Sequence, residues 1–366
     1  MAQLKLNGVA VVGGGPAGLM AALTAARLGT EVVLIDENLE PGGQLRKQIH
    51  KFFGSKAHRA GVRGYRIAQE LINDCIAAGV KFLSNSAVFS LNKRTIGLAD
   101  QHKAVLLKAD AVILATGASE NAVAFPGCTL PGVMGAGAAQ TFANLHRVLP
   151  GNRVLMVGGG NVGLIVSYQL LQAGAQVVAV VEALPRISGY QVHAAKIKRA
   201  GVPILTGHTV LKACGDGEVQ EVTVAAVDDH FMPLPGSERI FDVDTVCLAV
   251  GLTPLAELAW QAGCSFSYQP SLGGYVPLHS ANMETTMPHV YVAGDIAGVE
   301  EASTALEEGM IAGLAAGSSV GLSVPEAEFK AAQLRLQALR CGPFGQMRQQ
   351  AKNELVKRWT DCHVGG

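Results

Sequence analysis

The chain has 366 residues, of which 49% are hydrophobic and 16% are charged, and its 29 basic residues balance 29 acidic residues. A chain longer than about 300 residues usually forms more than one hydrophobic core, so we expect at least two domains. The balanced charge excludes a strong overall attraction to nucleic acid or to an anionic membrane. The sequence has no unbroken run of about 18 apolar residues, so we predict no transmembrane segment.

The first predicted element is an apolar strand at residues 8–13, which runs into the turn GGGPAG. Gly13, Gly15 and Gly18 have the GxGxxG spacing, and a small-residue helix and the strand EVVLID follow. In this context the glycines permit a tight turn, a close approach to a pyrophosphate, and close packing of helix on strand. Asp36 ends the second strand, where its carboxylate can accept hydrogen bonds from ribose hydroxyls. The sequence therefore predicts a dinucleotide site.

The next fragment to carry this pattern is RVLMVG, followed by the turn GGGNVG, a helix and the strand QVVAVVE. Its glycines are Gly158, Gly160 and Gly163, and Glu182 ends its second strand. Two matches, each with strand, helix and acid, predict two dinucleotide sites. The alternative is that the second turn is retained without binding anything.

Two dinucleotides in one chain predict an electron relay, with FAD resident at the first turn and NAD(H) exchanging at the second. A flavin suits the resident position because it can accept electrons from a nicotinamide and pass them on. Glu182 would repel the 2′-phosphate of NADP(H), which favours NAD(H), although Arg186 could offset that repulsion.

Two later strands end in turns that suit a flavin site. AVILATG contains Thr116 and Gly117, and VYVAGDIAG contains Gly294 and Asp295. The Asp295 carboxylate can bond the flavin ribitol, and the following helix N-terminus can stabilise negative charge on the flavin. The alternative role for Asp295 is a plain helix cap.

Together, GGGPAG, ATG, GGGNVG and AGD resemble the flavoprotein superfamily of thioredoxin reductase over about residues 5–322. The resemblance implies an α/β fold with two nested Rossmann-like domains. An FAD domain at 1–118 and 253–322 would enclose an NAD(P) domain at 119–252, and a helical C-terminal arm would follow at 323–366. VVEALPR, LTPLAELAWQAGC and AGDIAGVEEASTALEEGMIAG are most similar to the alpha subunits of heteromeric sarcosine oxidase, opine oxidase, hydrogen cyanide synthase and dye-linked proline dehydrogenase.

The resemblance also implies which residues contact the cofactors. The FAD contacts would be Gly13, Gly15, Pro16, Ala17, Gly18, Asp36, Glu37, Gly43, Gln44, Thr116, Gly117, Gly294 and Asp295. The nicotinamide nucleotide contacts would be Gly158, Gly160, Asn161, Val162, Gly163 and Glu182. The amide of Gln44, after the PGG turn, would lie near the isoalloxazine; a surface loop position is the alternative.

The sequence departs from the disulfide reductases of this superfamily, which need a redox-active cysteine pair. Neither PGGQLRKQIHKFFGS nor GAGAAQTFANLHR contains a cysteine, so we predict no redox-active disulfide. The seven scattered cysteines have no ligand spacing, which predicts free thiols in a reducing cytoplasm and no metal site.

Residues 48–66 are basic and contain no acid. The segment predicts an anion site over the flavin, with His50 or Lys51 as candidate catalytic residues and Arg59 and Arg63 binding a carboxylated or phosphorylated substrate. A solvated loop and a docking surface are the alternatives.

The C-terminal arm predicts two amphipathic helices separated by Gly342 and Pro343. In the first helix, near-helical spacing is seen for the apolar residues Phe329, Leu334, Leu336 and Leu339. This helix would pack on its own chain or on a second copy, or the arm would dock a separate catalytic subunit.

Three functions remain open from the sequence. The chain is the FAD- and NAD-binding subunit of a multi-subunit amine or amino-acid dehydrogenase or oxidase, a free-standing NADH-dependent flavin reductase of a small acceptor, or a nucleotide-binding subunit without catalysis.

Overall fold

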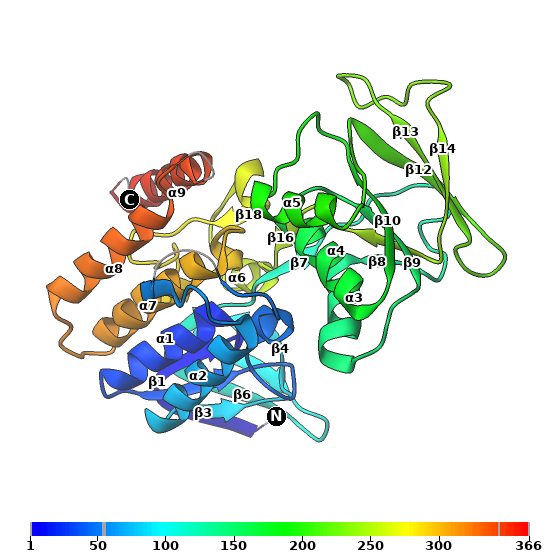
Figure 1. Ribbon diagram of the computed structural model, residues 1–366. Coiled ribbons are helices and arrows are strands. Elements are labelled where there is room, and N and C mark those ends of the chain that lie inside the picture. The colour runs from blue at the N-terminus through cyan, green and yellow to red at the C-terminus, as the bar shows by residue number, and fades with distance from the viewer. Residues whose placement is uncertain (1, 53–55, 343–344, 365–366) are drawn as a thin grey trace. The chain divides into compact units, whose positions relative to one another are not determined.

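The computed structural model describes residues 2–52, 56–342 and 345–364. The chain divides into two compact units (Figure 1). Unit 1 comprises Met1–Ser119 and Thr253–Gly366, and unit 2 comprises Glu120–Leu252. Each unit contains a Rossmann-like sheet, mainly parallel in unit 1 and parallel in unit 2, and unit 1 also carries C-terminal helices. The predicted α/β fold class with a helical C-terminal region is confirmed.

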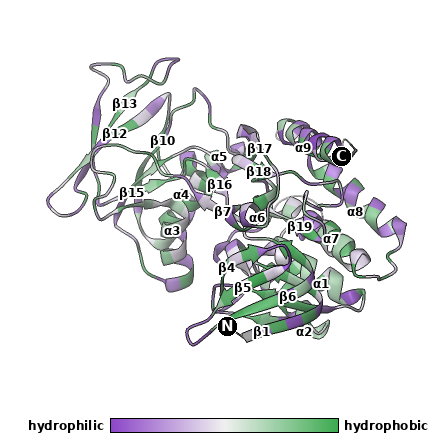
Figure 2. Ribbon diagram, turned by 180° about the vertical axis from the view of Figure 1, so that it is seen from behind, coloured by the Kyte–Doolittle hydropathy of each residue, from purple (hydrophilic) through white to green (hydrophobic). Residues whose placement is uncertain are grey.

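Unit 1 is built on a sheet with strand order β3-β2-β1-β6-β5-β4, in which β19 also pairs with β6. The parallel strands are β1 (Ala2–Val12), β2 (Glu31–Ile35), β3 (Lys81–Leu83), β6 (Ala104–Leu114) and β19 (Val290–Val292). The antiparallel strands are β4 (Ala87–Asn92) and β5 (Thr95–Ala99). Residues 9–12 of β1 and 111–114 of β6 are continuous buried apolar runs, as expected where helices cover a sheet, and the sheet carries green, hydrophobic segments in Figure 2.

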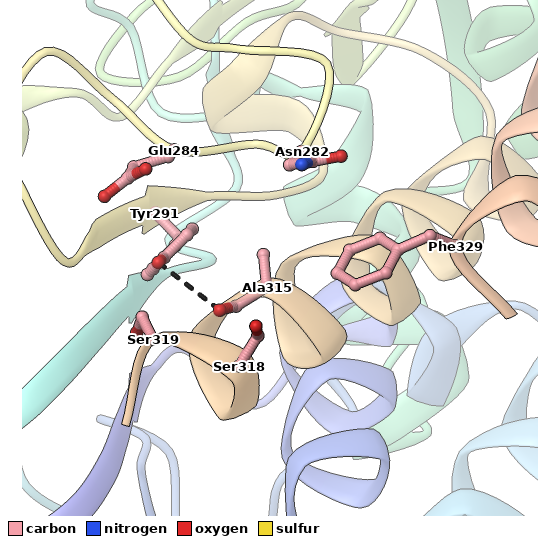
Figure 3. A pocket seen from close by; sticks show the side chains of 7 residues that line it. All are labelled: Asn282, Glu284, Tyr291, Ala315, Ser318, Ser319 and Phe329. Atoms are coloured by element: carbon pink, nitrogen blue, oxygen red, sulfur yellow. Dashed lines mark hydrogen bonds between the residues drawn. The ribbon is translucent and has the colours of Figure 1, made fainter. Parts of the chain in front are cut away.

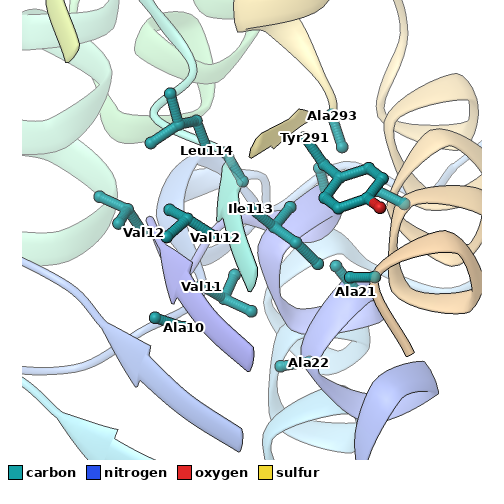
Figure 4. Close-up of a cluster of buried hydrophobic side chains, with 14 of the residues drawn as sticks. Ala10, Val11, Val12, Ala21, Ala22, Val112, Ile113, Leu114, Tyr291 and Ala293 are labelled. Atoms are coloured by element: carbon teal, nitrogen blue, oxygen red, sulfur yellow. The ribbon is translucent and has the colours of Figure 1, made fainter. Parts of the chain in front are cut away.

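Helix α1 (Pro16–Arg27) packs against α7 (Ala302–Ser319) at unusually close range. A Cβ atom added to Gly309 would lie 2.2 Å from the carbonyl oxygen of Ala17, and one added to Gly313 would lie 2.6 Å from that of Ala21. Ala21 and Ala22 belong to the core cluster shown in Figure 4, together with side chains from β1, β6 and β19. Small residues on both helices therefore allow α7 to lie directly on α1.

The remaining helices of unit 1 before the C-terminal arm lie in the segments that connect the elements of this core. They are α2 (Gly64–Ala77), α6 (Glu257–Gln261), η1 (Gly43–Lys47), η2 (Lys56–His58), η4 (Pro270–Leu272) and η5 (Asp295–Ala297). The hairpin strands are β17 (Phe266–Gln269) and β18 (Gly274–Pro277). The paired strands β7 (Ala118–Glu120) and β16 (Leu252–Pro254) lie where the chain passes from one unit to the other.

The C-terminal arm folds back on unit 1 as α8 (Glu326–Leu339) and α9 (Gln346–Val364). Helix α8 packs against α7 of its own chain, which is one of the arrangements that the sequence left open. The predicted apolar face of α8 is wrong at Leu334, which is 56% exposed, whereas Leu336 is buried. The two helices carry many hydrophilic residues (Figure 2), and charged contacts described below hold them in place.

Unit 2 has a parallel sheet of order β11-β10-β9-β15-β8. Its strands are β8 (Val133–Gly135), β9 (Arg153–Val157), β10 (Gln176–Glu182), β11 (Ile204–Thr206) and β15 (Thr245–Leu248). Its helices are α3 (Ala136–Thr141), η3 (Phe142–His146), α4 (Asn161–Ala173) and α5 (Gln191–Arg199). An antiparallel sheet of β12 (His208–Cys214), β13 (Glu221–Ala226) and β14 (Arg239–Asp242) completes the unit.

Within the described residues, no helix combines the length and the apolarity that crossing a bilayer requires. The same residues include no cluster of three or more His, Cys, Asp or Glu side chains suited to a metal ion.

Candidate functional site: two dinucleotide turns

The first turn links β1 to α1, and two of its glycines, Gly13 and Gly18, cannot be replaced without strain. Gly13 has a φ of 102°, and a Cβ atom there would lie 2.3 Å from the carbonyl oxygen of Ala115. A Cβ atom on Gly18 would lie 1.8 Å from the carbonyl oxygen of Gly13. These two glycines bring the helix start within contact of the strand ends, as the GxGxxG spacing predicts.

Gly15 differs from its neighbours because it faces open space. Its φ is −73°, which any residue adopts, and no atom lies within 4 Å of a Cβ atom built there. Gly15 is the N-cap of α1, which has no side-chain cap and no acidic residue in its first turn. The unpaired N–H groups and the positive end of the helix dipole therefore suit a pyrophosphate.

The PGG turn lies directly on this first turn. The N–H group of Gly42 donates a hydrogen bond to the carbonyl oxygen of Gly14 at 2.7 Å. A Cβ atom on Gly43 would lie 2.8 Å from the Cα atom of Gly15. The next residue, Gln44, is exposed. Sequence reasoning did not single out Gly42, although its place in the PGG turn was a usable signal.

The ATG and AGD motifs also meet at the first turn. A Cβ atom on Gly13 would lie 3.2 Å from the backbone nitrogen of Thr116, whose hydroxyl donates to the carbonyl oxygen of Leu255 at 2.6 Å. A Cβ atom on Gly294 would lie 2.8 Å from the Cβ atom of Ala17. Four motifs that are far apart in the sequence thus converge on one end of α1.

Asp36 is buried beside the turn and is held by backbone donors. Its Oδ2 atom accepts the N–H group of Gly14 at 2.6 Å, and its Oδ1 atom accepts the backbone and side-chain N–H groups of Asn38 at 2.8 Å and 2.9 Å. A carboxylate has about four acceptor positions, so room remains for a ribose hydroxyl. The adjacent Glu37 is exposed.

Asp295 follows β19 and precedes α7. Its Oδ1 atom accepts the N–H group of Glu300 at 3.3 Å. Burial of the carboxyl group raises the pKa of Asp295 to about 6, and the nearby carboxylates of Glu308 and Glu300 act in the same direction. The hydrogen bond from Glu300 and the ammonium group of Lys352 oppose that shift.

The second turn repeats the first in unit 2. Gly158 has a φ of 115°, and a Cβ atom on Gly163 would lie 2.0 Å from the carbonyl oxygen of Gly158. Glu182 accepts the N–H group of Gly159 at 2.8 Å and that of Leu184 at 3.0 Å. These are the counterparts of the bonds that Gly14 and Asn38 make to Asp36.

Gly160 and Asn161 begin α4, which again has no side-chain cap and no acid in its first turn. The nearest atom to a Cβ atom on Gly160 is the Ser188 hydroxyl oxygen at 3.5 Å. The N–H group of Gly189 donates to the carbonyl oxygen of Gly159 at 3.1 Å, as Gly42 does in the first turn. Sequence reasoning missed Gly189, whose signal was its place in the loop after Glu182.

The basic segment 48–66 is largely bonded within the chain. Arg59 pairs with Glu70, Arg63 donates to the carbonyl oxygen of Ile49 at 3.0 Å, and the buried His58 lies 3.1 Å from Glu307. The imidazole of His50 stacks on Phe52 with ring centroids 6.0 Å apart, and Lys51 is exposed. Residues 53–55 of this segment lie outside the described residues. The anion-site hypothesis stays a prediction.

The cysteines are free thiols. Burial raises the pKa of Cys75 to about 12 and that of Cys247 to about 12. The two thiols are therefore protonated at neutral pH and are poor nucleophiles.

A small cavity of about 270 Å³ lies at the C-terminal end of α7 (Figure 3). It is lined by Asn282, Glu284, Tyr291, Ala315, Ser318, Ser319 and Phe329. These residues belong to none of the four converging motifs, so the cavity is separate from the dinucleotide turns.

The sequence pattern of the pyridine nucleotide-disulphide oxidoreductase family matches residues 7–309. The chain belongs to this family. Membership makes it an oxidoreductase that uses FAD and a pyridine nucleotide. The resemblance predicted from the sequence is thereby confirmed.

Three curated relatives of this chain are named as enzyme subunits. The HcnB subunit of hydrogen cyanide synthase from Pseudomonas aeruginosa is 32% identical over 83% of this chain and 69% of the relative. An opine oxidase subunit from Agrobacterium tumefaciens is 28% identical over 84% of the chain and 64% of the relative. The alpha subunit of sarcosine oxidase from Corynebacterium sp. is 29% identical over 87% of the chain but only 34% of the relative.

Two solved structures share the fold. Thioredoxin reductase of T. acidophilum has a TM-score of 0.71 at 22% identity, over 86% of this chain and 98% of that one. L-proline dehydrogenase of P. horikoshii has a TM-score of 0.70 at 20% identity, over 92% of this chain and 59% of that one.

Proposed function

We propose that this chain is the FAD- and NAD-binding subunit of a multi-subunit amine or amino-acid dehydrogenase or oxidase. In this proposal FAD is resident at the first turn and NAD(H) exchanges at the second. The observation that carries the proposal is the repeated turn, in which an uncapped helix start opens beside a carboxylate that its own loop holds in place. The names of the curated relatives, all subunits of oxidases or of a synthase, support the assembly.

The residues of unit 1 fit a bound FAD. The open face of Gly15 and the first-turn N–H groups of α1 would hold the pyrophosphate, Asp36 the ribose, and Asp295 the ribitol. Bound there, the flavin would supply the chemistry, which is the acceptance or release of two electrons in the form of a hydride. The chain supplies binding, orientation and electrostatics.

The residues of unit 2 fit a pyridine nucleotide, and Glu182 favours NAD(H). Its two backbone donors, Gly159 and Leu184, keep the carboxylate at the end of β10. A carboxylate there can accept a 2′-hydroxyl group but repels a 2′-phosphate. Arg186 is exposed in the following loop.

We also propose that the relay needs no cysteine pair. Both stretches in which disulfide reductases carry their cysteines lack them here. The high pKa values of the Cys75 and Cys247 thiols support this proposal.

The test is an absorbance spectrum of the purified chain under anaerobic conditions, before and after addition of NADH. We expect a yellow protein whose flavin absorbance is lost with NADH, and, when oxygen is then admitted as the electron acceptor in the absence of the partner protein, returns only slowly. Rapid turnover with a small acceptor would favour a free-standing flavin reductase instead. A flavin that NADH leaves oxidised would favour a non-catalytic role, and a chain that cannot be reconstituted with FAD would overturn both cofactor assignments.

A further inference from the structure

A cluster of buried charges joins the C-terminal arm to α7. Arg340, at the end of α8, and Lys352, on α9, are 7% and 2% exposed. Both contact Glu308, at Nη2–Oε1 and Nζ–Oε1 distances of 2.5 Å and 2.6 Å. Arg340 also binds Glu300 through Nε and Nη2, and Lys352 lies 3.7 Å from the same carboxylate. Two buried cations therefore balance two buried acids.

Each acid of this cluster is bonded to the AGD turn. The Oε2 atom of Glu308 accepts the N–H group of Gly294 at 3.0 Å, and the N–H group of Glu300 donates to Asp295 at 3.3 Å. Gly294 in turn packs on Ala17 in the first turn of α1. A continuous set of contacts thus runs from the arm, through the two acids, to the turn that faces the proposed flavin site.

A cluster of this kind is not explained by stability alone. Removing four charged groups from water carries a large desolvation penalty, and apolar replacements of buried ion pairs are often neutral or stabilising. Removing one partner is different, because it leaves a buried charge uncompensated. The buried His279 adds no positive charge to the cluster, because burial and the charge of Lys352 lower its pKa to about 4 and keep it neutral.

We infer that Arg340 and Lys352 are positioning residues of the FAD site, which hold the Gly294–Asp295 turn against α1 through Glu308 and Glu300. This inference rests on the proposed function, in which FAD occupies the first turn. It makes the C-terminal arm a part of the flavin site and not only a docking arm. The charged groups that face Asp295 are Glu300 and Glu308 from around α7 and Lys352 from α9.

The experiment compares Lys352→Met and Arg340→Met with Arg335→Met in the full-length chain. Arg335 lies on α8, five residues before Arg340, but contacts Glu307 and the Met310 sulfur, which do not bond the AGD turn. Apoprotein is titrated with FAD at several pH values, and flavin fluorescence gives the dissociation constant. Thermal unfolding of each apoprotein gives its stability separately.

We expect Lys352→Met and Arg340→Met to weaken FAD binding about tenfold or more, which corresponds to ~1.4 kcal/mol. Arg335→Met should stay within about threefold of the unchanged chain. The Lys352 ammonium group lowers the pKa of Asp295, so its loss should raise that pKa. The midpoint pH at which FAD affinity changes should therefore move to a higher value. The conservative Lys352→Arg should keep both properties.

A charge-balanced double variant, Lys352→Met with Glu308→Gln, keeps the test decisive if the single variants fold poorly. The amide oxygen that Glu308→Gln introduces still accepts the Gly294 N–H group, so FAD affinity should recover relative to Lys352→Met. Equal loss of FAD affinity in Lys352→Met and Arg335→Met, or no loss in either, would overturn the inference. If the unchanged chain does not bind FAD, the proposed function fails instead, and the two failures are thereby distinguished.

Discussion

The two dinucleotide turns have the same backbone hydrogen bonds but different surroundings. Ala17 and Val162 occupy the same place in GGGPAG and GGGNVG, yet Ala17 is 4% exposed and Val162 is 40% exposed. Gly294 and α7 cover the first turn, since Gly294 packs on Ala17 and Gly309 lies against its carbonyl group. The second turn is bordered by its own loop at Gly189.

This difference explains how one motif can serve two purposes. A turn enclosed by several segments makes many contacts with its cofactor, which slows dissociation and suits a resident group. A turn covered by fewer segments makes fewer contacts and suits a coenzyme that must leave after each cycle. The surroundings, and not the motif itself, therefore distinguish the proposed FAD site from the proposed NAD(H) site.

The largest effects are expected from adding a side chain at the glycine that begins each helix, Gly15 or Gly160. Gly15→Val and Gly160→Val both have backbone angles that valine adopts, and neither new side chain starts from a clash. We expect Gly15→Val to lose FAD, with a dissociation constant raised at least about tenfold. Gly160→Val should keep FAD while the KM for NADH rises by at least about tenfold.

The ratio of flavin to protein absorbance and stopped-flow reduction by NADH measure these effects, with far-ultraviolet circular dichroism as the check on folding. A Gly160→Val chain that loses FAD, beside a Gly15→Val chain that retains it, would reverse the assignment of the two turns.

The next effect separates the two carboxylates. Glu182→Ser removes the charge that opposes a 2′-phosphate, so the ratio of kcat/KM for NADPH to that for NADH should rise about tenfold, or ~1.4 kcal/mol. Asp36→Ser, its counterpart in the first turn, should weaken FAD binding and leave that ratio unchanged. Steady-state kinetics with both coenzymes checks the result, and an equal change of the ratio in both variants would contradict the assignment of Glu182.

A smaller effect concerns Asp295 in the AGD turn. Because burial raises its pKa from an ordinary 3.8 to about 6, its contribution to stability is present below about pH 4 and is lost as the pH rises through 6. The Tm of FAD-free Asp295→Asn, relative to that of the unchanged apoprotein, should therefore increase by about a few degrees as the pH rises from 4.5 to 7.5.

The difference between the two proteins is the quantity to measure, because His279 titrates in both. Its pKa is lowered to about 4, so it destabilises the folded chain as the pH falls, which is the opposite direction. A Tm difference between variant and unchanged chain that does not vary with pH would show that Asp295 keeps its ordinary pKa.

The smallest effect is expected from the arginines of the basic segment. The Arg59–Glu70 pair is largely exposed on its glutamate side, and such pairs contribute less than about 1 kcal/mol. Arg59→Ala and Arg63→Ala should therefore change the free energy of unfolding in urea by less than about 1 kcal/mol and leave flavin reduction by NADH unchanged. A loss of turnover confined to carboxylated acceptors would support the anion-site hypothesis, and unchanged turnover with every acceptor would remove it.

Both turns could be predicted from the sequence because their geometry is local. Gly13 and Gly158 need positive φ, Gly18 and Gly163 need to lack a Cβ atom, and these requirements recur at a fixed spacing between strand and helix. The apolar strands that precede the turns are likewise recognisable from their hydrophobic runs. The apolar face of α8 is harder to predict, because Leu334 has the helical spacing of a buried residue but is exposed in the structure.

The sequence by itself determined the repeated strand, turn, helix and acid, since each of those signals lies within a few tens of residues. Only the tertiary structure decided that Gly43, Thr116 and Gly294 meet at one turn, and that Arg340 and Lys352 are buried on Glu308. The physical reason is that burial of a polar side chain depends on partners far along the chain. Arg340 and Lys352 lie 32 and 44 residues from Glu308, and their own helices read as ordinary charged surfaces.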